Sequence, residues 1–305
     1  MVQATAQMSA GRRPVPGRLP DMDDRQFSDW VDLIESRTGL CIAPERRSFL
    51  NTGIRLRMGE IGCHDYREYY RQLAAMPDQA SEWSLLVDRL TVHETRFFRH
   101  PPSLALLRDK WLERLSTSPE RHPLRAWSVG CASGEEAYTL AMLIDAHLES
   151  AQDERGFSVT GSDISQPAVA RARAGVYDSR SLAAIEPVFA RRYCRMLADG
   201  RFEIDPGLRD RVDFTQLNLR RLSKTPYHGL DLVYCQNLLI YFDREQRADI
   251  AGRLAACLRP GGVLVLGPGE LVGWRPEGME RIRHDDTLAW WRVDASVGGK
   301  TKESQ

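Results

Sequence analysis

Two adjacent glutamates follow a glycine-containing turn in the stretch RAWSVGCASGEEAYTL, residues 125–140. The residues before the turn are strand formers, and from Ala137 to Ile144 apolar residues recur at helical spacing. Small residues from Gly130 to Gly134 let the backbone take left-handed angles and pass close to a ligand. A strand, such a turn and a helix form the ligand crevice of open α/β sheets. We therefore expect a ligand at this turn.

The charge at the turn indicates what kind of ligand to expect. The glycines are spaced G-x-x-x-G rather than the G-x-G-x-x-G of dinucleotide-binding turns, and Glu135 and Glu136 stand where a phosphate would need open backbone donors. Carboxylates repel a phosphate and suit a cationic ligand, such as one that carries an ammonium and a sulfonium. The alternative is that both glutamates only favour the positive first turn of a helix.

Further polar residues follow the other predicted strands. Residues 158–165 form a strand ending in Asp163, and an acid at the tip of the second strand of a nucleoside-binding sheet commonly accepts hydrogen bonds from ribose. A third strand ends at Asn218, and the continuous apolar strand 230–243 runs into Gln236 and Tyr241. The carboxyl ends of these strands are expected to meet at one edge.

Composition limits the class of protein. The chain of 305 residues is long enough for two domains, and its Lys+Arg and Asp+Glu counts are both 42, so there is no global electrostatic case for nucleic acid or membrane as a partner. The six cysteines are scattered without metal-ligand spacing, which argues against zinc and against a disulfide framework. Without a signal peptide or a run of about 18 apolar residues, we expect a cytoplasmic protein with no membrane insertion.

The hydrophobic pattern divides the chain into segments. We expect a disordered segment at 1–20, a helical domain at 21–115, a linker at 116–124, an α/β domain at 125–294 and a disordered tail at 295–305. Residues 199–214 suggest a β-hairpin, with turns at Asp199-Gly200 and Pro206-Gly207, within an inserted β-subdomain at about 178–214.

The second predicted helix, about residues 44–60, is rich in arginine. Arg46, Arg47, Arg55 and Arg57 lie along it. Such a run forms either a solvated face or a docking patch for an acidic partner.

With these segments placed, the chain resembles the chemotaxis receptor methyltransferases, the CheR family, from about Asp24 to Val293. The motifs that carry the resemblance are LTVHETRFFR at 90–99, WSVGCASGEEAY at 127–138, SDI at 162–164, ARAGVY at 172–177, NL at 218–219, CQNLLIYF at 235–242 and LRPGG at 258–262. The resemblance implies an α/β fold: a class I S-adenosylmethionine-dependent methyltransferase sheet with an N-terminal all-helical domain and a small inserted β-subdomain. It implies S-adenosyl-L-methionine as cofactor, S-adenosyl-L-homocysteine as product, and no metal.

The resemblance also implies roles at the reacting end of the cofactor. Thr95 and Arg99 should contact the methionine end near the methyl, and Glu136 should hold its ammonium. Tyr241 should face the methyl that is transferred. Arg99 and Tyr241 are the expected catalytic residues, with Arg99 holding either the attacking carboxylate or the methionine carboxylate.

The remaining cofactor contacts are implied in the same way. Asp163 should bind the ribose, and Asn218 and Leu219 should flank the adenine. Gln236 and Asn237 should close the pocket from the fourth strand.

Three positions depart from the usual pattern of the family. His93 stands where asparagine is common, Gln236 where arginine is common, and Gly-Pro-Gly-Glu at 267–270 where Gly-His-Ser-Glu is common. His93 and Gln236 line the expected pocket, so they either alter cofactor affinity or mark a subfamily, for example one that serves a type IV pilus chemosensory system.

The implied reaction is methyl transfer to glutamate carboxylates on the cytoplasmic helices of methyl-accepting chemotaxis receptors. Two alternatives stay open: a class I methyltransferase with another acceptor, such as RNA or a small molecule, and a binding module that senses S-adenosylmethionine without transfer. The neutral net charge weakens the RNA version. The short turn LADGR, residues 197–201, lacks the glycine-rich loop of relatives that bind a receptor tether, which predicts tether-independent recognition.

Overall fold

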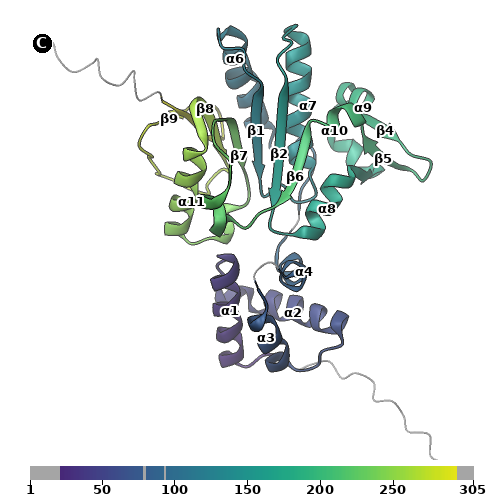
Figure 1. Ribbon diagram of the computed structural model, residues 1–305, viewed down its shortest axis with the longest axis vertical. Helices are drawn as coiled ribbons and strands as arrows, with labels where there is room; N and C mark the ends of the chain where they lie inside the picture. The colour runs from purple at the N-terminus through teal and green to yellow at the C-terminus, as the bar shows by residue number, and fades with distance from the viewer. Residues whose placement is uncertain (1–20, 78–79, 93, 294–305) are drawn as a thin grey trace, which may run out of the picture.

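The computed structural model describes residues 21–77, 80–92 and 94–293. Figure 1 shows a small helical domain beneath a larger α/β domain, with a three-stranded subdomain on one flank of the larger domain. The expected disordered segments 1–20 and 295–305 lie outside the described residues, and so does His93.

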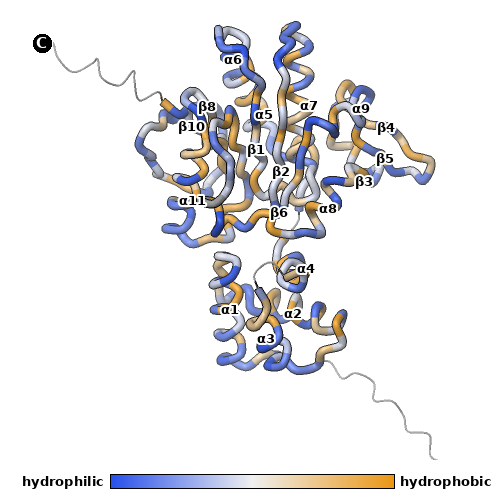
Figure 2. The backbone as a smooth tube through the Cα atoms, in the orientation of Figure 1, coloured by the Kyte–Doolittle hydropathy of each residue, from blue (hydrophilic) through white to orange (hydrophobic). Residues whose placement is uncertain are grey.

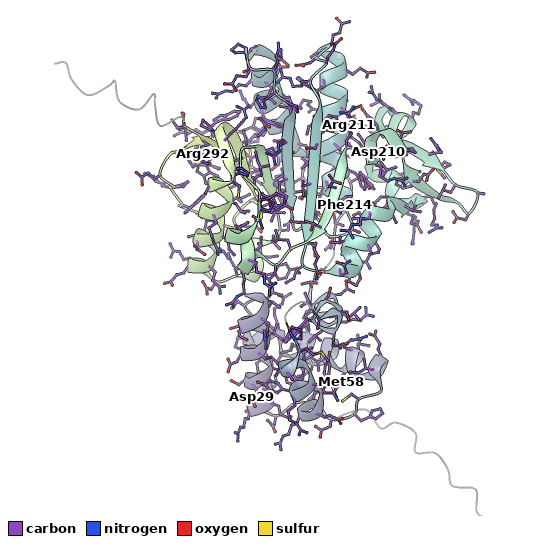
Figure 3. The ribbon with its side chains drawn as sticks, viewed as in Figure 1. Asp29, Met58, Asp210, Arg211, Phe214 and Arg292 are labelled. Carbon is purple, nitrogen blue, oxygen red and sulfur yellow. The ribbon has the colours of Figure 1, made fainter. Side chains whose placement is uncertain are left out.

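The helical domain consists of α1 (Asp24–Thr38), α2 (Arg47–Ile61), α3 (Tyr66–Ala75) and α4 (Ser81–Leu90). Each helix turns an apolar stripe inward, and hydrophobic and hydrophilic residues alternate along these helices in Figure 2. The core includes Trp30, Ile54 and Met58, the last of which Figure 3 labels. The helical pattern of this part of the sequence is therefore confirmed.

The larger domain contains a seven-stranded sheet in the order β6-β2-β1-β7-β8-β10-β9. The first five strands of this order run parallel, and β10 pairs antiparallel with both β8 and β9. The strands are β1 (Leu124–Val129), β2 (Phe157–Asp163), β6 (Val212–Gln216), β7 (Leu230–Cys235), β8 (Leu258–Leu266), β9 (Met279–Ile282) and β10 (Leu288–Arg292).

Helices cover both faces of this sheet. They include α5 (Pro101–Leu106), the wide turn η2 (Leu107–Leu112), α6 (Glu113–Thr117), α7 (Glu135–Ser150), α8 (Gln166–Ala174) and α11 (Arg244–Ala256), and α9 (Pro187–Tyr193) lies in the inserted subdomain. α7 and the segment from α5 to α6 pack in one apolar cluster, whereas α11 packs in another. The sheet thus lies between two hydrophobic layers.

Packing places the domain boundary earlier than the sequence predicted. Trp111, Leu112 and Leu115 are buried in the same cluster as β1 and α7, not in the core of the helical domain. The helical domain therefore ends near Leu90 rather than at residue 115. Helical periodicity alone does not show which core a helix joins, which explains the difference.

The inserted subdomain also differs from the predicted hairpin. β3 (Val176–Asp178), β4 (Cys194–Met196) and β5 (Arg201–Ile204) form a sheet in the order β3-β5-β4, so the hairpin spans 194–204 around Asp199-Gly200. Pro206 begins the short helix α10 (Pro206–Arg209), capped by Asp205, and β6 belongs to the main sheet. The prediction of a hairpin over 199–214 was wrong because Pro-Gly here starts a helix.

Strand β7 is shorter than its apolar run. It ends at Cys235, because Asn237 has a left-handed φ of 56° and residues Leu239–Tyr241 form the single turn η5. The expected strand over 230–243 is therefore a strand followed by a turn that faces the helical domain.

Candidate functional site

A cleft of about 990 Å³, including the solvent at its mouth, lies between the two domains at the carboxyl ends of the parallel strands. The helical domain contributes Thr38 and Leu40 to its wall, and the loop after α4 contributes Thr91 and Val92. The cleft brings together the described residues that were predicted to bind the cofactor or to act in catalysis: Thr95, Arg99, Glu136, Asp163, Asn218, Leu219, Gln236, Asn237 and Tyr241.

The floor of the cleft is the turn between β1 and α7. Gly130 and Gly134 take left-handed φ angles of 77° and 98°. A Cβ atom on Gly130 would lie 2.9 Å from Leu238 Cδ2, so glycine lets the turn approach the loop after β7. The amide nitrogens of Gly130 and Cys131 both donate to the carbonyl of Ser162, at 2.7 and 3.0 Å, which fixes the turn to β2.

The two glutamates of the turn have different environments, because neighbouring residues of a helix point about 100° apart. Glu136 borders the cleft, and its Oε1 accepts a hydrogen bond from Ser128 Oγ at 2.7 Å. Burial among protein atoms raises the pKa of Glu136 to about 8, against the opposing effects of Ser128 and Arg99. Glu135 is buried away from the cleft and accepts a hydrogen bond from Ser133 Oγ at 2.8 Å.

Asp163 is held at the end of β2 by main-chain donors. Its Oδ2 accepts from the amide of Ala132 and its Oδ1 from the amide of Ser165, both at 2.9 Å. These bonds fix the carboxylate against the glycine turn while it lines the cleft. A carboxylate so oriented suits a ligand with hydroxyl donors.

Asn218 joins the two domains with its side chain. Its Nδ2 donates to the carbonyl of Arg37 at 2.9 Å, and its Oδ1 accepts from the amide of Arg220 at 3.0 Å. The amide group is therefore engaged in positioning the turn that starts at Leu219, and both Asn218 and Leu219 line the cleft.

Gln236 belongs to a buried polar network that the sequence did not reveal. Its Nε2 donates to Ser103 Oγ at 2.7 Å, and Ser103 Oγ also lies 2.8 Å from His100 Nδ1. Burial lowers the pKa of His100 and raises that of Tyr234, which also contacts Ser103. Ser103 lies outside every motif quoted above, so no sequence signal pointed to it.

The turn that carries Tyr241 is anchored from two sides. The amide of Cys41 in the helical domain donates to the carbonyl of Tyr241 at 2.7 Å. Behind the turn, the buried carboxylate of Glu270 accepts from the amide of Gly267 at 2.8 Å, and burial raises its pKa against the backbone amides of Ile240 and Leu239. Its place beside Leu239 and Ile240 makes Glu270 a candidate positioning residue for the Tyr241 turn.

The four arginines of the second helix do not share one environment. Arg57 donates to both carboxylate oxygens of Glu82, at 2.8 and 2.6 Å, and its side chain is only 12% exposed. Arg47 pairs with Asp24, and Arg55 pairs with Asp21 and Tyr66. These three side chains lie within the helical domain and outside the lining of the cleft.

Of these four arginines, Arg46 is the one that lies beside the cleft. Its guanidinium carbon is 5.4 Å from the centre of the Tyr241 ring and 5.2 Å from that of Phe49. Arg57 is engaged by Glu82, whereas Arg46 is the member of the predicted docking patch that lies beside the cleft. Docking by the four arginines stays a prediction.

The carboxylate acceptors of the cleft fit a ligand with a cationic end and a hydroxylated end. Glu136 supplies a carboxylate with one hydroxyl partner among the described side chains, and Asp163 supplies a second carboxylate at the tip of the next strand. Within residues 21–77, 80–92 and 94–293, no group of three or more His, Cys, Asp or Glu side chains is placed to hold a metal ion. The same residues contain no helix that is long and apolar enough to cross a membrane.

Comparisons with known proteins match a separate family model to each of the two domains. The family model described as CheR methyltransferase, SAM binding domain, matches residues 93–287, and the model described as CheR methyltransferase, all-alpha domain, matches residues 25–91.

Named relatives match most of the chain. A "Probable biofilm formation methyltransferase WspC" of Pseudomonas aeruginosa is 34% identical to this chain. The matched segment covers 82% of this chain and 58% of the length of that relative. "Chemotaxis protein methyltransferase 1" of the same organism is 29% identical over 82% of this chain and 92% of its own length. "Chemotaxis protein methyltransferase Cher2" of Pseudomonas putida is 27% identical over 84% of this chain and 94% of its own length. The protein therefore belongs to the CheR family of S-adenosylmethionine-dependent methyltransferases.

Proposed function

We propose that the protein transfers the methyl group of S-adenosylmethionine to glutamate side-chain carboxylates on the cytoplasmic helices of chemoreceptors, and that it does so in the cytoplasm. The observation that supports this most is the convergence of Glu136, Asp163, Arg99 and Tyr241 in one cleft that both domains build. The two relatives matched over nearly their whole length are named chemotaxis protein methyltransferases.

Each end of the cleft fits one part of the cofactor. Glu136 would hold the ammonium, Asp163 the ribose hydroxyls, and the backbone at Asn218 and Leu219 would border the adenine. The cofactor supplies an electrophilic methyl on a sulfonium. The chain binds and orients it and excludes water, with Gln236 held at the wall by Ser103.

The acceptor needs placement rather than activation. A glutamate with an ordinary pKa of about 4.3 is already ionised at pH 7, so no general base is required. Holding two reactants in line contributes roughly 7–11 kcal/mol in favourable cases. Arg99, whose charge reaches Glu136, and Tyr241, which also lines the cleft, are the groups that would align the attacking carboxylate.

A labelling experiment tests this function. The protein is incubated with methyl-labelled S-adenosylmethionine and a receptor cytoplasmic fragment, or alternatively with RNA or with a small-molecule extract. We expect label on the receptor fragment and its release as methanol by mild base, as for a carboxyl ester. Label on RNA or on a small molecule would show another acceptor. Cofactor binding without transfer to any of the three would indicate a sensor.

A further inference from the structure

The side-chain amide of Gln236 is held in one of its two possible orientations by residues behind the wall of the cleft. Gln236 lines the cleft and is only 6% exposed, and its Nε2 donates to Ser103 Oγ at 2.7 Å. Ser103 is fully buried, and its Oγ lies 2.8 Å from Nδ1 of His100. An amide group has a donor on one side and an acceptor on the other, so its orientation decides which of the two the cleft presents to a ligand.

The hydrogen positions in this chain of side chains follow from the backbone of α5. His100 caps this helix, because the amide of Ser103 donates to His100 Nδ1 at 3.2 Å. Nδ1 is therefore the unprotonated nitrogen of a neutral imidazole, and burial favours this form by lowering the pKa of His100, against the opposing effect of Asp286. Because Nδ1 accepts, the hydroxyl of Ser103 donates to it. The Ser103 oxygen then accepts from Gln236, so Nε2 must be the amide atom that faces Ser103.

The other amide atom, Oε1, is left for a ligand. In the described part of the chain no group donates a hydrogen bond to Gln236 Oε1. Tyr234, which also contacts Ser103, is the register partner of Ser128 on β1, and Ser128 donates to Glu136. Burial and, after it, the nearby carboxylate of Glu136 raise the pKa of Tyr234. Gln236 and Glu136 therefore border the same part of the cleft.

We propose that the side-chain carbonyl oxygen of Gln236 accepts a hydrogen bond from the ammonium of the cofactor beside Glu136, and that Ser103 and His100 are positioning residues that set this orientation. The proposal rests on the proposed function, which places the ammonium at Glu136. An ammonium has three donors, so one carboxylate leaves room for a further acceptor. A ligand carboxylate, in contrast, has no hydrogen to donate to Oε1. Gln236 then selects ligands by their amino group.

Three ligands distinguish an acceptor from a donor at Gln236: S-adenosylhomocysteine, its analogue with hydrogen in place of the amino group, and its analogue with hydrogen in place of the carboxylate. Calorimetry at pH 8 gives the Kd of each ligand for the wild type and for Gln236→Met, which keeps the length of the side chain without the amide. The two ligands with an amino group should bind Gln236→Met about tenfold more weakly than the wild type, because a hydrogen bond to a charged group is lost. The amine-free analogue should bind both proteins equally.

Two results for Gln236→Met would overturn the proposal. The first is unchanged affinity for all three ligands. The second is a loss of affinity for the two ligands that keep the carboxylate, with none for the carboxylate-free analogue, because Nε2 would then face the ligand.

Substitutions behind the wall test the positioning residues. Ser103→Ala frees the amide of Gln236 to turn, so the preference for S-adenosylhomocysteine over its amine-free analogue should fall about threefold. His100→Leu should have the same effect, whereas His100→Asn should keep the preference, because its side-chain oxygen can accept from both the amide and the hydroxyl of Ser103. Ser116→Ala is the matched control, since Ser116 Oγ also lies 2.8 Å from a histidine nitrogen, that of His147, but outside the lining of the cleft.

The variants also separate positioning from a merely structural role. An equal loss of affinity for all three ligands in Ser103→Ala, or a preference that stays at the wild-type value in both Ser103→Ala and His100→Leu, would overturn the role of Ser103 and His100. Methylation of receptor fragments is measured separately. If these fragments are not methylated while the ligand preferences hold, the proposed function fails and the orientation of Gln236 stands.

Discussion

Replacing Glu136 by glutamine separates the charge of the cleft from its shape, because glutamine keeps an acceptor for Ser128. In the free protein, burial raises the pKa of Glu136 from 4.5 to about 8, which corresponds to about 5 kcal/mol. This figure is an upper bound, because the carboxylate borders a solvent-filled cleft. At pH 7 the carboxyl is mostly protonated, so binding a ligand ammonium should expel a proton.

The expected result is a bell-shaped dependence of affinity on pH. Below pH 8, the affinity for S-adenosylhomocysteine should fall by up to tenfold per pH unit, because Glu136 must lose its proton. At higher pH, the affinity should fall again as the ligand amine loses its own charge. In Glu136→Gln the acid limb should vanish, and the affinity at pH 8 should fall by about 1.5–3 kcal/mol.

Calorimetric titrations between pH 6 and 9 measure this effect, and Glu135→Gln is the matched control. Glu135 is buried and hydrogen-bonded to Ser133 outside the lining of the cleft. Its replacement should therefore leave the bell-shaped dependence of affinity on pH unchanged. A flat affinity for the wild type between pH 6 and 8, or an acid limb that persists in Glu136→Gln, would refute the assignment of Glu136 to the ammonium.

The same shift predicts the stability of the free protein. A carboxyl whose pKa is raised in the folded state binds its proton more tightly there, so its favourable contribution is present below about pH 4.5 and is lost as pH rises to about 8. Glu136→Gln should therefore unfold at a higher denaturant concentration than the wild type at pH 8 and at the same concentration near pH 4.

Three further changes test other parts of the structure. Asp163→Ala should weaken S-adenosylhomocysteine binding by about 1.5–3 kcal/mol, and unchanged affinity in a folded variant would reject the ribose placement. Arg57→Ala should lower the free energy of unfolding by up to about 3 kcal/mol, because it removes the cation from the partly buried Glu82 carboxylate and leaves the hydroxyl of Tyr69 as its hydrogen-bond donor. Arg46→Glu should leave unfolding unchanged and raise the acceptor KM. The reverse pattern in urea titrations and kinetics would contradict these roles. Glu270→Ala should lower kcat more than cofactor affinity, because it releases the Tyr241 turn, and loss of affinity alone would argue against that role.

Several residues that line the cleft, among them Glu136, Asp163 and Gln236, could be placed from the sequence because three local patterns converge. The apolar run before Gly130 predicts β1, the periodicity after Glu135 predicts α7, and Asp163 and Gln236 follow apolar strands. In a parallel sheet such residues must meet at one edge, so the placement needs no tertiary information. Their chemical roles come from the resemblance and stay predictions.

The features that the sequence missed depend on partners far away in the chain. Arg57 is held by Glu82 of α4, and Gln236 by Ser103, so neither local pattern reveals the contact. The helical periodicity of the segment 101–117 is compatible with either domain. Only its burial against β1 and α7 shows that it belongs to the α/β domain. The strand β9 (Met279–Ile282) was not predicted, because a short strand at the edge of a sheet has few buried residues.

The most direct test of the central claim is tandem mass spectrometry of a receptor cytoplasmic fragment after reaction with the protein and S-adenosylmethionine. We predict one added methyl per modified site, located on glutamate side chains, absent when those residues are replaced by alanine and removed by mild base. A methyl group on lysine, arginine or the chain terminus, or an unmodified fragment in the presence of folded protein that binds the cofactor, would contradict the account.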